Sequence, residues 1–300
     1  MKKSLNSQKI KQLDKSDMLG LLLDFPQQCK AAVSIAEAAP VRVKKNNFNK
    51  IVFAGMGGSA IGADLVRSYL YSKSKIPVLV FREYTLPPYV DSSTLVFVSS
   101  YSGNTEETIS AYKEAKDRGA IIVVVSSGGK LKESAIKDNV SFVEIPQGLP
   151  PRCALGYLSL IPLCVLAKLG LIEDAGEEIS EAIKLLEELK NKSLSPYIGQ
   201  KENIAKTVAL NLFNKFAVIY SASMHFDICA TRLRGQLAEN SKALSSTHLF
   251  PEMNHNEIVG WENPGKLFKN FIVLELRDKG MHPRVLRRMD VTADILKKTG

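Results

Sequence analysis

The stretch TLVFVSSYSGNTEET, Thr94 to Thr108, decides the fold. Its run of β-branched and aromatic residues indicates a strand that is buried on both faces. A turn of serines and one glycine follows, and after it comes an acidic segment that favours a helix. Hydroxyl and amide side chains at a helix start satisfy free backbone N–H groups, but the same groups also hold a phosphate. The stretch therefore predicts a strand, a turn and a helix, with either a capped helix start or an anion site at the turn.

Other apolar runs of similar length surround this one and alternate with helical segments. Short runs rich in Val and Ile, separated by helices, are typical of a parallel sheet that is covered on both faces. The sequence thus predicts an α/β domain with a doubly wound parallel sheet. The other expected strands are KIVFAGMGG (50–58), IPVLVFREY (76–84), GAIIVVVSS (119–127) and VSFVEIP (140–146).

The same pattern begins again in the second half of the chain, with strands expected in 214–223, 246–250 and 271–278. The polar, proline-bearing segment PQGLPPR marks the boundary. We therefore expect an N-terminal helix and a first domain in residues 1–150, and linking helices and a second domain in 151–300. The apolar segment 154–171 resembles a membrane span, but Pro162 and Lys168 interrupt it, so a buried helix is the better interpretation.

The composition is that of a soluble globular protein, with 45% hydrophobic and 24% charged residues. The net charge of +9 is scattered among acidic residues, and no basic tract alternates with aromatics. Neither nucleic acid nor a membrane is therefore the expected partner. The four cysteines lack CxxC spacing, and the basic start lacks the apolar core of a signal peptide. We expect a cytoplasmic protein with reduced thiols and no structural zinc.

A second glycine-rich turn, GMGGSAIGADL (55–65), lies between an expected strand and an expected helix. It could be a dinucleotide fingerprint, with Glu83 for the ribose, or only a tight turn. Ser59 stands at the helix start here, however, as the hydroxyls of the first turn do at theirs. Two hydroxyl-bearing turns at strand C-termini can meet at the crevice where open sheets bind ligands. A monophosphate would use both turns, whereas NAD needs only one.

Five segments in order carry a resemblance to a known family: GMGGSAIGAD, SSYSGNTEET, PRCALGY, QLAENSK and PEMNHNEIVGW. The chain resembles the bifunctional phosphoglucose/phosphomannose isomerases over about residues 16–300. The resemblance implies two SIS-type (sugar isomerase) domains with flavodoxin-like sheets, and a homodimer with shared active sites. It implies an enzyme that interconverts glucose 6-phosphate and mannose 6-phosphate with fructose 6-phosphate through a cis-enediolate. No pair of histidines has HExxH spacing and the reaction needs only a carboxylate base, so we expect neither a metal nor a cofactor.

The resemblance also implies roles for individual residues. Arg152 corresponds to the arginine that supports the enediolate, and Glu239 to the base that moves the proton between C1 and C2. His255 corresponds to the histidine for ring opening, which the neighbouring subunit supplies. These residue types suit the chemistry, because a carboxylate can shuttle a proton and a guanidinium stabilises charge on oxygen. The implied substrate-lining residues are Gly57, Gly58 and Ser59, and the implied phosphate-binding residues are Ser100, Ser102 and Thr105.

The residues alone leave alternatives open. Glu239 could be an ordinary charge on a helix surface, and Arg152 could merely brace the domain junction. His225 lies near Asp227, so an ancillary role for it stays open. Another SIS-fold sugar-phosphate isomerase, a non-catalytic sugar-phosphate-binding protein and an NAD-dependent dehydrogenase are the rival functions.

One departure from the family concerns the C-terminus. The family ends with a further strand and helix that carry an active-site lysine. This chain ends with MDVTADILKKTG, before that segment, and neither Lys297 nor Lys298 corresponds to the family lysine. We therefore expect the second domain to be C-terminally truncated.

Overall fold

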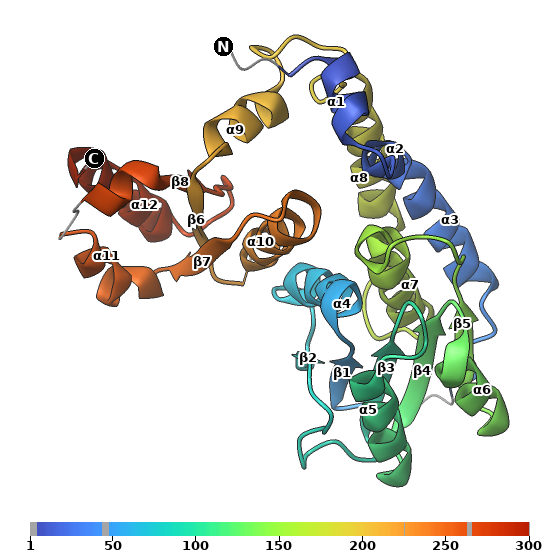
Figure 1. Ribbon diagram of the computed structural model, residues 1–300. Helices are drawn as coiled ribbons and strands as arrows, with labels where there is room; N and C mark the ends of the chain where they lie inside the picture. Colours follow the sequence, from blue (N-terminus) through green and yellow to red (C-terminus); the bar gives the residue numbers. More distant parts are fainter. Residues whose placement is uncertain (1–4, 44–47, 225, 263–265, 300) are drawn as a thin grey trace. The chain divides into compact units, whose positions relative to one another are not determined.

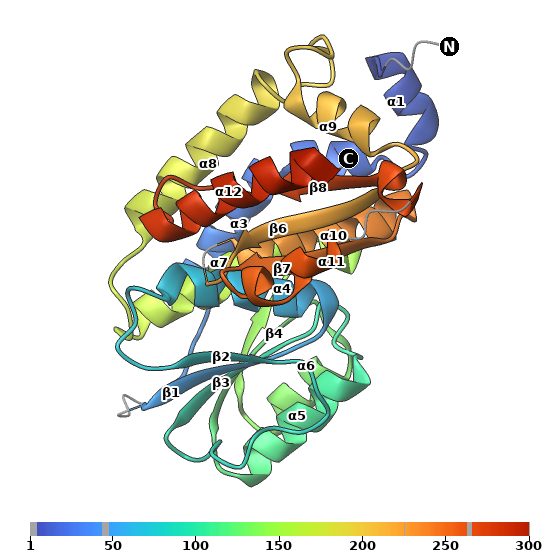
Figure 2. The same ribbon diagram turned by 90° about the vertical axis from the view of Figure 1, so that its left-hand side faces the viewer.

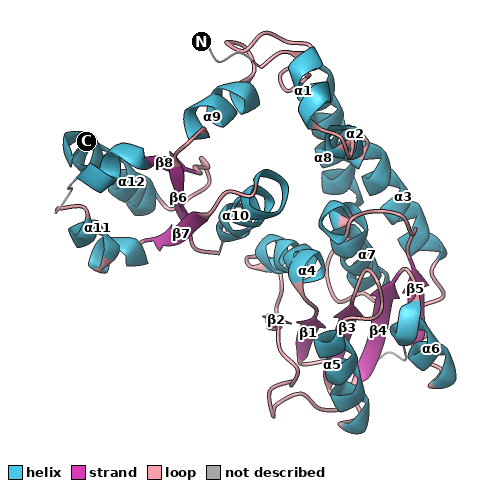
Figure 3. Ribbon diagram, viewed as in Figure 1, coloured by secondary structure: helices cyan, strands magenta, loops and turns pink. Residues whose placement is uncertain are grey.

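The computed structural model describes residues 5–43, 48–224, 226–262 and 266–299 (Figure 1). Its contacts divide the chain into two compact units, and each is described by itself. One unit is Lys11–Lys192, and the other combines Met1–Ile10 with Ser193–Gly300. Both are built from helices and parallel strands (Figure 3).

The sheet of the first unit has five parallel strands in the order β2-β1-β3-β4-β5 (Figure 1). Figure 2 shows β2, β1 and β3 side by side. The strand predicted from the opening stretch is β3, and all six of its residues are buried because strands pair with it on both sides. In the register of β1 with β3, Phe53 lies opposite Phe97, and their rings stack with centroids 5.0 Å apart. The strands are β1 (Lys50–Ala54), β2 (Val78–Phe81), β3 (Thr94–Ser99), β4 (Ile121–Ser126) and β5 (Ser141–Glu144).

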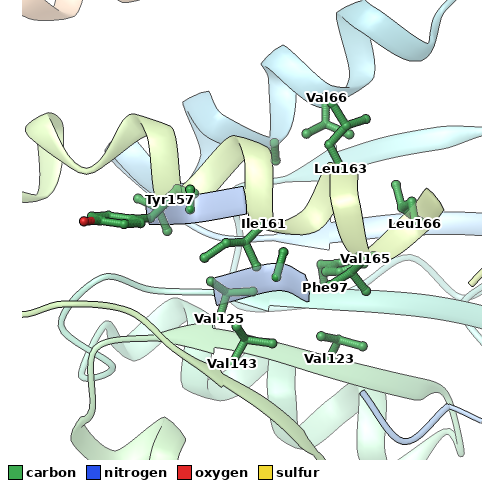
Figure 4. Packing of buried hydrophobic residues seen from close by; sticks show 14 of the residues in the cluster. Val66, Phe97, Val123, Val125, Val143, Tyr157, Ile161, Leu163, Val165 and Leu166 are labelled. Atoms are coloured by element: carbon green, nitrogen blue, oxygen red, sulfur yellow. The ribbon is translucent and has the colours of Figure 1, made fainter. Parts of the chain in front are cut away.

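Helices cover both faces of this sheet, as the alternation of strands and helices predicted (Figure 1). On one face the sheet packs against α3, α4 and α7, through side chains that include Phe97, Val125 and Ile161 (Figure 4). On the other face it packs against α5 and α6. The helices are α2 (Met18–Leu23), α3 (Phe25–Ala38), α4 (Gly57–Leu70), α5 (Glu106–Asp117), α6 (Gly129–Lys137), α7 (Leu155–Lys168) and α8 (Gly176–Asn191), with α1 (Ser7–Leu13) before them.

The apolar segment after residue 153 forms α7, a buried helix that packs against α3 and α4. In the described part of the chain, no helix is both long enough and apolar enough to cross a membrane. Because α7 packs on α3 and α4, and α8 packs on α3, the first compact unit extends to Lys192. The boundary that we expected at residue 150 would instead assign α7 and α8 to the second domain, although α7 packs on the first sheet.

The second unit has a parallel sheet of three strands in the order β7-β6-β8. Its central strand comes first in the chain, the next pairs on one side and the third on the other, as β1, β2 and β3 do. The strands are β6 (Phe216–Ala222), β7 (Ser245–Phe250) and β8 (Phe271–Glu275). The helices are α9 (Ile204–Leu212), α10 (Asp227–Ser241), α11 (Glu257–Gly260) and α12 (Pro283–Thr299), with short 3-10 turns η2 (Glu252–His255) and η3 (Lys266–Asn270).

Gly62 lets α4 and α7 approach each other closely. A Cβ atom on Gly62 would lie 2.6 Å from the backbone oxygen of Leu158, which is too close for any side chain. Gly62→Ala should therefore lower the free energy of unfolding by about 1–3 kcal/mol, the usual range for overpacking.

Chemical denaturation measures this loss, and Gly235→Ala in α10 is the matched control. A Cβ atom on Gly235 has nothing within 4 Å, so alanine should leave stability unchanged or raise it by up to about 1 kcal/mol. Equal effects of the two substitutions would contradict close helix packing at Gly62.

Candidate active site

Two turns meet at the C-terminal edge of the first sheet, where the order β2-β1-β3 changes direction. Open parallel sheets bind ligands at such a switch point. The turn after β1 contains Gly55, and a Cβ atom there would lie 2.8 Å from the backbone oxygen of Ser99 at the end of β3. The glycine turn and the serine turn therefore begin side by side, at the ends of the paired strands β1 and β3.

Gly57 and Gly58 serve different purposes in the first turn of α4. Gly57 has a φ of +48°, which favours glycine, and no atom lies within 4 Å of its missing side chain. A Cβ atom on Gly58 would lie 2.7 Å from the backbone oxygen of Pro151 and 3.3 Å from the Cα of Arg152. Because Gly58 has no side chain, the segment that carries Arg152 can pack directly against its backbone. Ser59, the next residue, is buried.

In the serine turn, the hydroxyls bind one another and the turn. Ser100, only 2% exposed, has its Oγ 2.8 Å from Thr105 Oγ1, and it accepts a hydrogen bond from Gly103 N. Thr105 occupies the N-cap position of α5, but its side chain makes no capping hydrogen bond. The capped-helix alternative therefore does not describe the Thr105 hydroxyl. Ser102 is exposed, and its Oγ accepts a hydrogen bond from Asn104 N.

Two residues of this turn escaped the sequence analysis. Thr108, one helical turn after Thr105, is 1% exposed, and its Oγ1 has no hydrogen-bond partner among the described residues. Tyr101 joins the serine turn to the segment before Arg152. Its OH donates to the oxygen of Pro146 (3.0 Å) and accepts from the N–H of Leu149 (2.8 Å). Both hydrogen bonds span more than forty residues, so the sequence could not show them. The only sign that Tyr101 matters was its position inside the segment SSYSGNTEET.

Glu239 and His255 both belong to the second unit, where the structure does not bring them together. Glu239 is an exposed residue near the end of α10, just before β7. His255 ends η2, which follows β7. The six residues of β7 span about 20 Å. One chain therefore holds these two residues at opposite ends of one strand.

A hydrogen-bonded network anchors the segment that follows His255. The Oε2 atom of Glu257 lies 2.7 Å from Nδ1 of His248. Its Oε1 atom accepts a hydrogen bond from the OH of Tyr220 at 2.5 Å. Trp261 Nε1 donates to the same OH at 2.9 Å. Burial raises the pKa of Tyr220, and its hydrogen bond to Glu257 raises it further. The network explains why the segment PEMNHNEIVGW contains Glu257 and Trp261, whose roles sequence reasoning did not identify.

His225, for which the sequence left an ancillary role open, lies outside the described residues. Within the described ranges, no group of three His, Cys, Asp or Glu side chains could hold a metal ion. The residues that the structure does bring together are the two turns and Arg152 in the first unit.

Tyr220→Phe should destabilise the second unit, because it removes the partner of the buried Trp261 N–H and of Glu257. An unsatisfied buried donor costs about 1–3 kcal/mol. Trp261 is the only tryptophan of the chain, so its fluorescence reports the loss directly during denaturation. Tyr197→Phe is the matched control, because Tyr197 is 84% exposed. An unfolding midpoint that matches this control would show that the network does not stabilise the unit.

With this geometry in place, comparisons with known proteins identify the family. Residues 46–137 match the family model of the SIS domain, and residues 201–300 match that of the bacterial phospho-glucose isomerase C-terminal SIS domain. The bifunctional phosphoglucose/phosphomannose isomerase of Caldicellulosiruptor bescii is 46% identical over 281 residues, which are 93% of this chain and 82% of the relative. The protein of the same name from Aquifex aeolicus is 39% identical over 84% of this chain and 74% of its own.

Solved structures show the same fold at low sequence identity. The C-terminal domain of glucosamine-fructose-6-phosphate aminotransferase from Francisella tularensis has a TM-score of 0.66 and 13% identity. The match covers 94% of this chain and 81% of that one. At such identity it shows the fold alone, an α/β fold of SIS type. The identity to the curated relatives, over most of both chains, shows that the chain belongs to the family of bifunctional phosphoglucose/phosphomannose isomerases.

Proposed function

We propose that this protein is an aldose–ketose isomerase that interconverts glucose 6-phosphate and mannose 6-phosphate with fructose 6-phosphate through a cis-enediolate. The observation that carries the proposal is the 46% identity to a bifunctional isomerase over 93% of the chain. The meeting of the glycine turn, the serine turn and Arg152 at one sheet edge supports it. The substrate is a phosphorylated hexose, and the enzyme works in the cytoplasm with its four cysteines as free thiols.

The serine turn holds the substrate phosphate in this proposal. Ser100, Ser102 and Thr105 supply hydroxyls, and α5 supplies backbone N–H groups at its positive end. Thr105 does not cap α5, and its hydroxyl, 2.8 Å from that of Ser100, stands with it at the helix start, where both could hydrogen-bond a phosphate. The phosphate provides binding energy far from the reacting carbons and fixes the end of the sugar that reacts.

Glu239, Arg152 and His255 carry out the chemistry. Glu239 removes the proton from C2 of the aldose and returns it to C1, so one base serves both carbons. Negative charge develops on oxygen in the enediolate, and the guanidinium of Arg152 stabilises it. The sugar enters as a ring, and His255 opens it by moving protons between ring oxygen and hydroxyl. Gly57, Gly58 and Ser59 line the bound sugar.

The active site is shared between two subunits of a homodimer. Since the length of β7 separates Glu239 from His255 in one chain, the histidine that completes each site comes from the partner. A closed twofold dimer then contains two equivalent sites, each with Glu239 from one chain and His255 from the other.

The proposed activity is tested by incubating the purified protein with fructose 6-phosphate and separating the products by chromatography. Both glucose 6-phosphate and mannose 6-phosphate should form, with and without EDTA. Glucosamine 6-phosphate serves as the alternative substrate. Its turnover in place of fructose 6-phosphate would favour another SIS-fold isomerase, and binding without any turnover would favour a sugar-phosphate-binding protein.

Ser100→Ala and Thr105→Val should each weaken binding of fructose 6-phosphate by about 1–3 kcal/mol, as expected for a hydrogen bond to a charged group. Isothermal titration calorimetry measures the loss. Ser110→Ala, in the middle of α5, is the matched control and should bind like the parent. If all three variants bind equally well, the serine turn is structural and holds no phosphate.

The shared site predicts complementation between two inactive variants. Glu239→Gln and His255→Ala should each be nearly inactive, because the base and the ring opener act in sequence. After co-refolding at equal amounts, half of the dimers are mixed, and each mixed dimer has one site with both native groups. Activity should thus return to roughly a quarter of the parent value, by counting sites in a twofold pair. A self-contained subunit would show no recovery.

A further inference from the structure

Arg152 lies in a turn that secondary structure alone does not hold. The turn is η1 (Pro151–Cys153), a 3-10 helix of only three residues between the sheet and α7. A guanidinium that stabilises an enediolate must stand at a fixed place, because preorganised charge is what lowers the barrier. Some other group must therefore fix the backbone beside Arg152.

Gln28, on α3, makes this connection with both ends of its amide. Its Nε2 donates to the backbone oxygen of Cys153 at 2.8 Å, and its Oε1 accepts from the backbone N–H of Gly156 at 2.7 Å. These partners lie 125 and 128 residues further along the chain. The side chain is only 6% exposed, so water cannot easily replace either bond.

The segment PRCALGY is shaped to receive this amide. Gly156 has no side chain, and a Cβ atom there would lie 2.8 Å from Gln28 Oε1. Gly58 receives the other side of the same turn, since a Cβ atom on it would lie 2.7 Å from the oxygen of Pro151. The backbone on either side of Arg152 is thus held between α3 and α4.

We propose that Gln28 is a positioning residue for Arg152, an inference that rests on the proposed role of Arg152 in stabilising the enediolate. Both hydrogen bonds of Gln28 go to backbone groups beside Arg152, so it acts through the turn that carries the guanidinium. Without its amide, the Cys153 oxygen and the Gly156 N–H lose their shared partner and the turn shifts. A displacement of about 1 Å at a reacting group can cost on the order of 100-fold in rate.

Gln28→Met tests the proposal, because methionine has nearly the same volume and cannot form the two hydrogen bonds. We expect kcat for fructose 6-phosphate to fall by about 10-fold or more, with KM within about twofold of the parent. Gln27→Met is the matched control, since Gln27 is the exposed neighbour on the same helix, and it should keep parental kinetics. Parental kcat in a folded Gln28→Met protein would overturn the proposal.

A double-mutant cycle with Arg152→Ala separates positioning from general damage. If Gln28 acts only through Arg152, Gln28→Met should lower kcat in the parent but cause no further loss in the Arg152→Ala background. The same fold-loss in both backgrounds overturns the role of Gln28 and leaves the isomerase assignment intact. Parental kcat in Arg152→Ala alone would overturn the proposed role of Arg152, and this inference with it.

Gly156→Ala provides an independent route to the same result, and it carries the test if Gln28→Met does not fold. Alanine favours a helix more than glycine does, but its methyl group would lie 2.8 Å from Gln28 Oε1, so we expect the amide to shift away from its backbone partners. We expect the same selective fall in kcat with little change in KM. A folded Gly156→Ala protein with parental kcat overturns the proposal.

Discussion

Direct contact of backbone with backbone around α4 is the constraint on which the rest of the first unit depends. Three glycines, one just before this helix and two within it, each admit a different piece of chain. Gly55 receives the end of β3, Gly58 receives the turn of Arg152, and Gly62 receives α7. The spacing of these glycines therefore joins the serine turn, the arginine and the buried helix around one helix end.

The second unit repeats the strand arrangement of the first but carries a different set of side chains. In the first unit, the strand ends carry hydroxyls, glycines and one guanidinium, which suit an anion. In the second, a carboxylate and an imidazole, those of Glu239 and His255, stand at the two ends of β7, and a network through Tyr220 anchors the segment after His255. Two sheets of similar topology thus present different chemical groups at their strand ends.

The sequence predicted the features that are local in the chain. Apolar runs marked the central strands β1, β3, β4 and β6, because burial selects Val, Ile and Phe at successive positions, and the serine turn lay where expected. Features that depend on distant partners were not predictable. The residues near Gln28 and Tyr101 in the sequence do not indicate their hydrogen-bond partners, which lie far along the chain. The hydroxyl of Thr105 pairs with that of Ser100 and does not cap its own helix. The placement of α7 and α8 with the first sheet depends likewise on packing against α3.

The fit of Gln28 against Gly156 also bears on how such a protein can change over generations. A side chain at residue 156 would crowd the amide at its present place, and a shorter side chain at residue 28 would remove the partner of two backbone groups. A change at either position alone therefore disturbs the contact that the other residue makes. We expect these two residues, more than a hundred positions apart in the chain, to change together rather than one at a time.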